Sequence, residues 1–495
     1  MRTLTLVFFI GILISLSSCR TDFETVASTG DLEFSKKTVY LDTVFKNIGS
    51  STYNLKVYNR TKNDITIPSI KLENGLNSKF RMTIDGMQGN EGKAFDNITL
   101  LAKDSLYIFI ETTANTIDGE VSPDDKNKYT YTDTIKFVSV GKTQFVKLVT
   151  LIQDAVFLYP EKSSNKFTLN ENELDFTNKK PYVIYGYAGV PMGKTVTFEA
   201  GSRVHFHADS GLIVGENASI HVNGTESPDI KYPEQNEVIF EGDRLEPEFS
   251  DVPGQWGTIW LTNGSTNHKL NHLTIKNATI GLLIQNNDGT TVQIKNTQIY
   301  NCSNYGILAQ TAKINGENMV INNAGQASLA CTYGGDYNFT HCTLNNNWNS
   351  SSQVAVLVNN FYLGADPEAK PLTAATFNNC IIYGSYSNEM FLTKKSGSAF
   401  EYQFNNCLLK FDNTSNQYTN HPEYQFNIDP THYNNIILNK DPKFLNVSQN
   451  KFNIDETSAA YKNGEKDYRI ETDIVGVPRT TTPDIGAYQS APFTK

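Results

Sequence analysis

A six-residue pattern recurs along the second half of the chain, with Asn or His in third place and Ile or Leu in sixth place. Its members are IKNATI (275–280), IKNTQI (294–299), GENMVI (316–321), FTHCTL (339–344), FNNCII (377–382) and FNNCLL (404–409). The pattern returns about every 22 residues, a period typical of solenoids, in which each repeat is one coil that stacks on the next. This repeat restricts the possible folds more than any other feature.

Short apolar strands at this spacing predict a right-handed parallel β-helix. Neighbouring coils would pair their strands about 4.8 Å apart, so equivalent residues would stack into files. Amide side chains stacked at a turn can hydrogen-bond from coil to coil. We therefore expect the third-place residues to form an asparagine ladder, in which His341 replaces an Asn: Asn277, Asn296, Asn318, Asn379 and Asn406.

The cysteines fit the same interpretation. Apart from Cys19 the chain has five, an odd number for a disulfide framework. Cys342, Cys380 and Cys407 each follow the third-place residue. Because a free cysteine behaves as a small buried apolar residue, we expect these three to fill the core. Neither a CxxC nor an HxxxH spacing accompanies them, so the sequence predicts no metal site and no cofactor; calcium remains possible without a motif.

The region from 33 to 155 has a different pattern. Seven short alternating or β-branched segments are separated by turn residues, which predicts an immunoglobulin-like β-sandwich. The stretch LDTVFKNIGSSTYNLKVYNRTKNDITIPSI also resembles the Ig-like modules of Bacteroidota surface proteins, where such a domain serves as a spacer or docking surface. The predicted class is therefore all-β.

The end of the chain carries a second resemblance. DIGAYQ (484–489) is similar to the DIGAYE that closes many bacterial β-helix proteins, with Gln489 where Glu is usual. We expect this segment to cover the last coil and block its open strand edge. The predicted organisation is a leader at 1–19, a tether at 20–32, the sandwich at 33–155, a linker into the helix at 156–194, the β-helix at 195–415, and terminal coils with a cap at 416–495.

The N-terminus predicts export and a lipid anchor. LTLVFFIGILISL (4–16) is too short to span a bilayer but suits a signal-peptide core. Leu16-Ser17-Ser18-Cys19 resembles the lipobox of bacterial lipoproteins, in which the cysteine carries the lipid. Asp22, Phe23 and Glu24 lie in an acidic patch that resembles the Bacteroidota signal for surface export. These resemblances imply an outer-membrane lipoprotein exposed at the cell surface.

One charged insertion interrupts the repeats. FEGDRLEPEFSDVPGQWGTIW (240–260) is a loop with acids, one arginine and two tryptophans. Because Trp256 and Trp260 are four residues apart in a strand-like run, we expect them to face the same side. The segment could be a structural loop, a docking surface anchored by aromatic residues and Arg, or a glycan or calcium site of an enzyme. The candidate binding residues are Asp243, Arg244, Glu246, Glu248, Asp251, Trp256 and Trp260.

Composition narrows the function. The formal net charge of −10 argues against nucleic acid as a partner. The predicted coil surfaces are rich in Asn, Thr, Ser and Gln, which transfer protons poorly near neutral pH. The sequence thus favours a non-catalytic binding or scaffold subunit, an accessory of an outer-membrane β-barrel complex for uptake, export or barrel assembly. The alternatives are a polysaccharide lyase or glycoside hydrolase that uses the acids of 240–260, and a glycan-binding adhesin.

Overall fold

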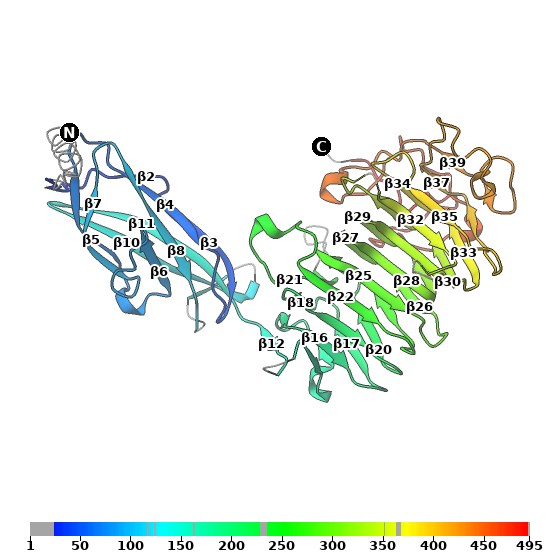
Figure 1. Cartoon of the computed structure of the whole chain (residues 1–495), viewed down its shortest axis with the longest axis horizontal. Coiled ribbons are helices and arrows are strands. Elements are labelled where there is room, and N and C mark those ends of the chain that lie inside the picture. Colours follow the sequence, from blue (N-terminus) through cyan, green and yellow to red (C-terminus); the bar gives the residue numbers. More distant parts are fainter. Residues whose placement is uncertain are drawn as a thin grey trace, which may run out of the picture. The chain divides into compact units, whose positions relative to one another are not determined.

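The computed structural model (Figure 1) describes residues 24–493 except 116, 118, 123, 124, 162, 163, 228–234, 351 and 363–367. The chain divides into two compact units, 1–154 and 155–495. Both units are built from strands, as predicted, with a few single-turn 3-10 helices in the described residues. The leader, Cys19, Asp22 and Phe23 lie outside the described residues, whereas Glu24 is described and exposed.

The first unit is a two-sheet β-sandwich. One sheet has the strand order β1-β5-β10-β11-β3, with β7 on β5 and β9 on β10; the other has the order β2-β4-β8-β6. The strands of the first sheet are β1 (Val26–Ala27), β3 (Thr38–Phe45), β5 (Ile65–Leu72), β7 (Ala94–Leu100), β9 (Glu120–Ser122), β10 (Asp125–Ser139) and β11 (Lys142–Gln153). Those of the second are β2 (Glu33–Phe34), β4 (Tyr53–Tyr58), β6 (Phe80–Ile84) and β8 (Ser105–Thr112).

Alternation along each strand explains the sandwich. In β8, Leu106, Ile108 and Ile110 are buried, whereas Tyr107 and Phe109 between them are exposed. Successive side chains of a strand point to opposite faces, so one face of each sheet enters a shared core. That core also takes Phe80 and Phe137.

The second unit is a parallel β-helix, as the repeat predicted. Each coil contributes one strand to a smaller sheet and two to a larger sheet, and neighbouring coils pair in parallel. Among the described residues the smaller sheet consists of β12 (Val156–Leu158), β15 (Tyr182–Ile184), β18 (Arg203–Phe206), β21 (Val238–Gly242), β24 (Leu273–Lys276), β27 (Gln298–Cys302), β29 (Val320–Ala324), β31 (Thr343–Asn346), β34 (Ile381–Gly384), β37 (Leu408–Leu409) and β39 (Ile437–Leu438).

The larger sheet contains two files of strands. The first file is β13 (Lys166–Thr168), β16 (Tyr187–Val190), β19 (Gly211–Val214), β22 (Trp256–Leu261), β25 (Ala278–Gln285), the first halves of β28 (Tyr305–Glu317) and β30 (Ala327–Thr340), β32 (Val354–Asn359) and β35 (Met390–Thr393). The second file is β14 (Asp175–Phe176), β17 (Thr195–Glu199), β20 (Ser219–Asn223), β23 (Lys269–Asn271), β26 (Val292–Lys295), the second halves of β28 and β30, β33 (Leu372–Asn378), β36 (Gln403–Asn405) and β38 (Tyr433–Asn434).

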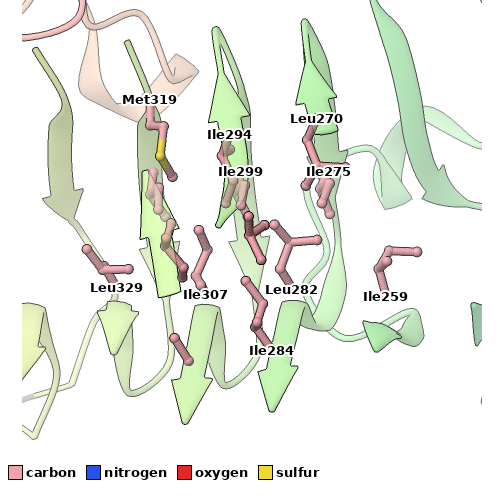
Figure 2. Close-up of a cluster of buried hydrophobic side chains, with 14 of the residues drawn as sticks. Ile259, Leu270, Ile275, Leu282, Ile284, Ile294, Ile299, Ile307, Met319 and Leu329 are labelled. Atoms are coloured by element: carbon pink, nitrogen blue, oxygen red, sulfur yellow. The ribbon is translucent and has the colours of Figure 1, made fainter. Parts of the chain in front are cut away.

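The interior of the helix is filled by rows of stacked apolar side chains (Figure 2). Ile259, Leu282, Ile307 and Leu329 are paired in register from coil to coil, and all four are fully buried. Burying one such side chain contributes about 1.5–3 kcal/mol, and each row repeats this gain in every coil. Cys342, Cys380 and Cys407 are free and buried in this core, as expected.

The helix begins earlier than predicted. β12 already pairs with β15, and β13 with β16, so the first coil starts at Val156 and not near residue 195. The first coils lack the Asn-centred pattern that revealed the later ones. The 3-10 helices η2 (Glu171–Glu173) and, in later connections, η4 (Pro422–Tyr424), η5 (Val447–Gln449) and η6 (Lys466–Tyr468) lie between or after the strands.

The last coil is covered by aromatic residues and not by the DIGAYQ segment. Tyr424 hydroxyl accepts a hydrogen bond from the Leu392 N–H at 2.9 Å and lies 3.1 Å from the Leu392 carbonyl, on the last first-file strand. Phe411, Tyr424 and Tyr433 join the core there. The Tyr424 hydroxyl and the neighbouring aromatic rings thus cover the open edge of a strand that has no further coil to pair with.

The C-terminal segment runs along the outside of the smaller sheet instead. Ala487 N–H donates to Thr343 Oγ1 at 3.0 Å, and Asn379 Nδ2 donates to the Glu465 carbonyl at 2.9 Å. Ile485 packs with Ile381 and Leu408 on the outer face of that sheet. The expectation of an end cap at 484–489 is therefore wrong: these residues cover the side of the helix.

Candidate docking surface on the solenoid

The charged insertion is a well-braced loop between β21 and β22. Its 3-10 helix η3 (Pro247–Phe249) begins with a proline. Gln255 Nε2 donates to the carbonyls of Phe249 at 2.6 Å and Val252 at 2.9 Å, and Asn277 Nδ2 donates to the Ser250 carbonyl at 2.9 Å. The loop is thus fastened to the corner that follows β24.

The predicted binding residues of this loop have separate local partners. Asp243 lies 2.7 Å from His207 Nδ1, and Arg244 pairs with Glu246 at 2.8 Å. Asp251 accepts a hydrogen bond from Asn301 Nδ2 at 3.1 Å. Glu248 is exposed on η3. Asp243, Glu246 and Asp251 thus each have a polar partner within the protein.

The two tryptophans of the insertion face opposite sides, contrary to expectation. Trp256 is 1% exposed and stacks on Phe206 in the core, with ring centroids 4.3 Å apart. Trp260 lies on the outer face, where its Nε1–H donates to Gln285 Oε1 at 2.8 Å. Along β22 the alternation of buried and half-buried residues breaks between Thr258 and Ile259, where the pairing register with β25 also shifts.

Four of the five predicted ladder residues lie in one file at the corner between the second-file strands and the smaller sheet. Asn318 Nδ2 donates to Asn296 Oδ1 at 3.0 Å, and Asn379 Nδ2 lies 3.1 Å from His341 Nε2. Asn406 occupies the equivalent place one coil further on, directly after Asn405, which pairs with Asn378. Each of these residues has a positive φ, between 47° and 54°, a conformation that Asn tolerates better than most residues.

The assignment of Asn277 to this file is wrong. Asn277 lies at the next corner, after β24, where it stacks with Asn301 and Asn323. Its φ is +64°, so both corners require the same left-handed residue. The residue that occupies the predicted file in this coil is His272, whose Nε2 lies 3.2 Å from Asn296 Nδ2.

His341 stays uncharged within the file. Burial, followed by the neighbouring Arg479 guanidinium, holds the pKa of His341 well below its ordinary value of 6.5. Its Nδ1 lies 3.3 Å from the Gly486 carbonyl, so Nδ1 carries the proton and Nε2 accepts from Asn379. His341 therefore acts as a neutral link between the ladder and the C-terminal segment.

The first file presents an apolar row on its outer face, which sequence reasoning missed. The residues of this row pair with one another in register from coil to coil. The row, which we call the apolar wall, consists of Ile213, Trp260, Leu283, Leu308, Ala330, Leu357 and Phe391. Phe391 is 41% exposed, Ala330 is buried and the others are half-buried. At about 4.8 Å per step the apolar wall is about 29 Å long.

A signal for this wall is present in the sequence. The first-file strands read as runs without alternation: GLLI (281–284), GILA (306–309) and AVLV (355–358). Near-continuous apolar runs are typical of strands that are covered on both faces. In the described residues the inward members of these runs fill the core, and the outward members face away from it.

The second file presents the opposite chemistry. Its outer row, which we call the polar wall, consists of Thr197, His221, Lys269, Gln293, Asn315, Asn338, Thr376 and Gln403. Amides bond along it: Asn315 Nδ2 donates to Gln293 Oε1 at 3.1 Å, and Asn338 Nδ2 donates to Asn315 Oδ1 at 2.8 Å. Lys295 and Glu317 form an ion pair of 2.8 Å in the next row.

Two negative observations concern the described part of the chain. No three His, Cys, Asp or Glu side chains gather there in a way that could hold a metal ion. No helix in that part has the length and apolar character needed to cross a bilayer.

No protein-family model and no curated protein matches this chain. Solved structures give weak similarities. One is a family 123 glycoside hydrolase from Clostridium perfringens (6% identity, 26% of this chain and 30% of that chain, TM-score 0.17). Others are a PapD-like domain of human CEP192 (12%, 25% and 84%, 0.16) and the VesB protease of Vibrio cholerae (13%, 25% and 32%, 0.17). This chain thus spans about a third of the hydrolase and of the protease, and scores this low support no conclusion about fold or function.

Proposed function

We propose that this protein is a non-catalytic surface lipoprotein whose β-helix docks on another protein through the apolar wall. The lipid on Cys19 would hold it on the outer membrane, with Asp22, Phe23 and Glu24 directing it to the cell surface. The partner would be an outer-membrane β-barrel protein complex. The observation that carries this proposal is the charge-free row from Ile213 to Phe391 on the outside of the solenoid.

The partner must offer an apolar surface. Water contact with a row of this length is unfavourable, and contiguous apolar rows on soluble proteins mark interaction sites. Trp260 and Phe391 are large side chains of the kind that dominate binding energy at interfaces. Beside them, Gln285 Nε2 donates to Gln310 Oε1 at 2.8 Å, which provides a polar rim.

The rival enzymatic function would use the acids of the charged loop. Asp243 lies 2.7 Å from His207 Nδ1, and Glu246 pairs with Arg244 at 2.8 Å. If the rival lyase or hydrolase function were correct, Asp243→Asn or Glu246→Gln would abolish turnover of a uronic-acid polymer while the fold survived.

Affinity capture from native membranes tests the proposal. We expect the tagged protein, solubilised in mild detergent, to retain a barrel protein at all salt concentrations, because apolar contacts are not screened. The double variant Leu283→Asp/Leu308→Asp should capture at least tenfold less of that barrel protein. The matched control Thr376→Asp/Gln403→Asp changes two residues that are paired in the same way on the polar wall, and it should retain the partner. Recovery of the unchanged protein as a lone monomer would contradict the docking role.

The anchor is tested separately. Cys19→Ser should abolish incorporation of labelled palmitate and release the protein from the membrane fraction. Continued labelling of the variant would contradict lipidation at Cys19.

A further inference from the structure

A cleft of about 840 Å³ opens on the outer face of the smaller sheet. Its floor is formed by β24 and β27, through Thr274, Lys276, Gln298 and Tyr300. One side is the end of the charged loop, and the other is the C-terminal segment around 449–453 and 474–477. We call it the lateral cleft. Its volume lies within the range of about 300–1,000 Å³ that is usual for ligand sites.

A hydrogen-bonded network fixes the floor of the lateral cleft. Thr274 Oγ1 donates to Glu237 Oε2 at 2.8 Å, and Gln298 Nε2 lies 3.4 Å from both Glu237 oxygens. Tyr300 hydroxyl in turn donates to Gln298 Oε1 at 2.7 Å. These bonds hold the Glu237 carboxylate in one orientation at the bottom of the cleft, before any ligand arrives. A preorganised acceptor of this kind binds hydroxyl groups without a further ordering cost.

The lining of the lateral cleft combines apolar and polar side chains. Val475 and Val477, at the lip formed by the C-terminal segment, are 45% and 42% exposed. The lining also carries amides and hydroxyls, including Asn301, Gln449 and Asn453. A sugar ring has the same mixed character, since its C–H faces are apolar and its rim carries hydroxyl groups. Few other polar ligands need an apolar lip beside so many amide groups.

The charges of the lining favour an uncharged ligand. Glu226, Glu237 and Asp251 contribute carboxylates, against the lysines Lys276 and Lys451. Lys276 Nζ also lies 3.9 Å from Glu241. His272 adds little positive charge, because burial lowers its pKa below the ordinary 6.5. A carboxylated sugar polymer would therefore meet an excess of negative charge.

We infer that the lateral cleft is a binding site for a short neutral oligosaccharide, held by the Glu237 carboxylate and the surrounding amides and packed against the Val475–Val477 lip. This site is distinct from the apolar wall, and it binds its ligand without catalysing a reaction. Neither the docking role nor the sugar site depends on the other.

Calorimetric titration of the detergent-solubilised full chain tests the inference. The probes are cellohexaose, xylohexaose, mannohexaose and maltohexaose, with hexagalacturonate as the charged comparison. We expect a dissociation constant below 1 mM for at least one neutral hexamer, and binding of hexagalacturonate at least tenfold weaker.

Variants locate the site. Val475→Asp/Val477→Asp places charge on an exposed lip and should weaken binding of the neutral hexamer at least tenfold. Ile428→Asp, at a side chain that is 76% exposed and does not line the lateral cleft, is the matched control and should leave binding unchanged. Glu237→Gln keeps the volume of the floor and should weaken binding about tenfold, because a neutral amide accepts hydrogen bonds less strongly than a carboxylate.

Three outcomes would overturn the inference. They are binding of hexagalacturonate more tightly than every neutral hexamer, no neutral hexamer bound at 1 mM, or full binding by the folded lip variant. The capture of a membrane partner is measured independently, so failure here would not be mistaken for failure of docking.

Discussion

The apolar wall and the polar wall are the outer faces of two neighbouring files of strands in the same coils. They share the same strand spacing and continue one another within β28 and β30, yet one consists of apolar residues and the other of polar residues, most of them Asn, Gln and Thr. Stacking demands apolar residues only on the inside of a coil. The outward residues are free to differ: the polar wall meets water and its own amides, and the apolar wall is the surface that we propose a partner covers.

The largest expected effect is the difference in stability between charging an inward residue and charging an outward residue of the same first-file strand. Ile307 is fully buried, and the next residue, Leu308, faces outward. Ile307→Asp should lower the free energy of unfolding by about 4 kcal/mol or more, because it buries an unpaired charge. Leu308→Asp should cost about 1 kcal/mol, the scale of strand preferences. Urea denaturation measures both. Equal losses would mean that the apolar wall is packed within the molecule and is not a free surface.

A buried carboxyl beside the end of the apolar wall makes stability depend on pH. Glu389 is fully buried next to β35, and its Oε1 accepts the Tyr386 N–H at 2.7 Å. Burial raises the pKa of Glu389 from 4.5 to about 8. The folded state therefore keeps a proton that the unfolded state releases, so the contribution of Glu389 to stability is fully present below pH 4.5 and is lost as the pH rises toward 8. Between pH 5 and 7 this contribution is about 3 kcal/mol.

Glu389→Gln provides the control for this dependence. The amide cannot ionise, so the difference in unfolding free energy between the variant and the unchanged protein should grow steadily from pH 5 to pH 7. A difference that stays constant with pH would show that Glu389 ionises normally in the folded protein.

A smaller effect tests the amide bonds of the polar wall. Asn338 donates to Asn315 and accepts from Asn378 Nδ2 at 3.3 Å. Asn338→Leu should cost about 1–2 kcal/mol, because it leaves partners on two coils without their bond. Thr376→Leu in the same row is the comparison and should change the melting temperature little. Equal stability of the two variants would show that the amide bonds of the polar wall do not stabilise the fold.

The smallest effect concerns the ion pair beside the polar wall. The Lys295 and Glu317 side chains are 46% and 24% exposed, and exposed pairs contribute about 0–1 kcal/mol. Lys295→Ala should lower the free energy of unfolding by about 0.5 kcal/mol or less in dilute buffer, and by less still in 1 M salt. A loss that persists in 1 M salt would point to packing of the lysine stem and not to its charge.

The repeat predicted the fold because stacking requires the same inward side chains in every coil. It misplaced Asn277 for a physical reason: both corners of the coil need a left-handed residue, and Asn serves at either one. The segment LNHLTI (270–275), with His272 in third place, was the true member of the file. An Asn in the sequence therefore does not show which of the two corners of the coil it occupies.

The sites were harder to predict than the fold. The side that Trp260 faces depends on a break in the alternation between Thr258 and Ile259, which no residue in WGTIW indicates. The lateral cleft combines Glu237, Tyr300 and Val475 from three distant segments. Such a site has no local pattern, because a fold and not a motif brings its side chains together.

The path of the C-terminal segment has a consequence for how the molecule matures. Arg479 Nη2 donates to Asn318 Oδ1 at 2.9 Å, across 161 positions of the chain. Coils synthesised early thus wait for residues 465–489 before their flank is sealed and the cleft gains its second side. A chain that is stalled on the ribosome or cut before this segment could still form its coils, but half of the binding site would be missing. Ligand affinity would then show whether the C-terminal segment is present and in place.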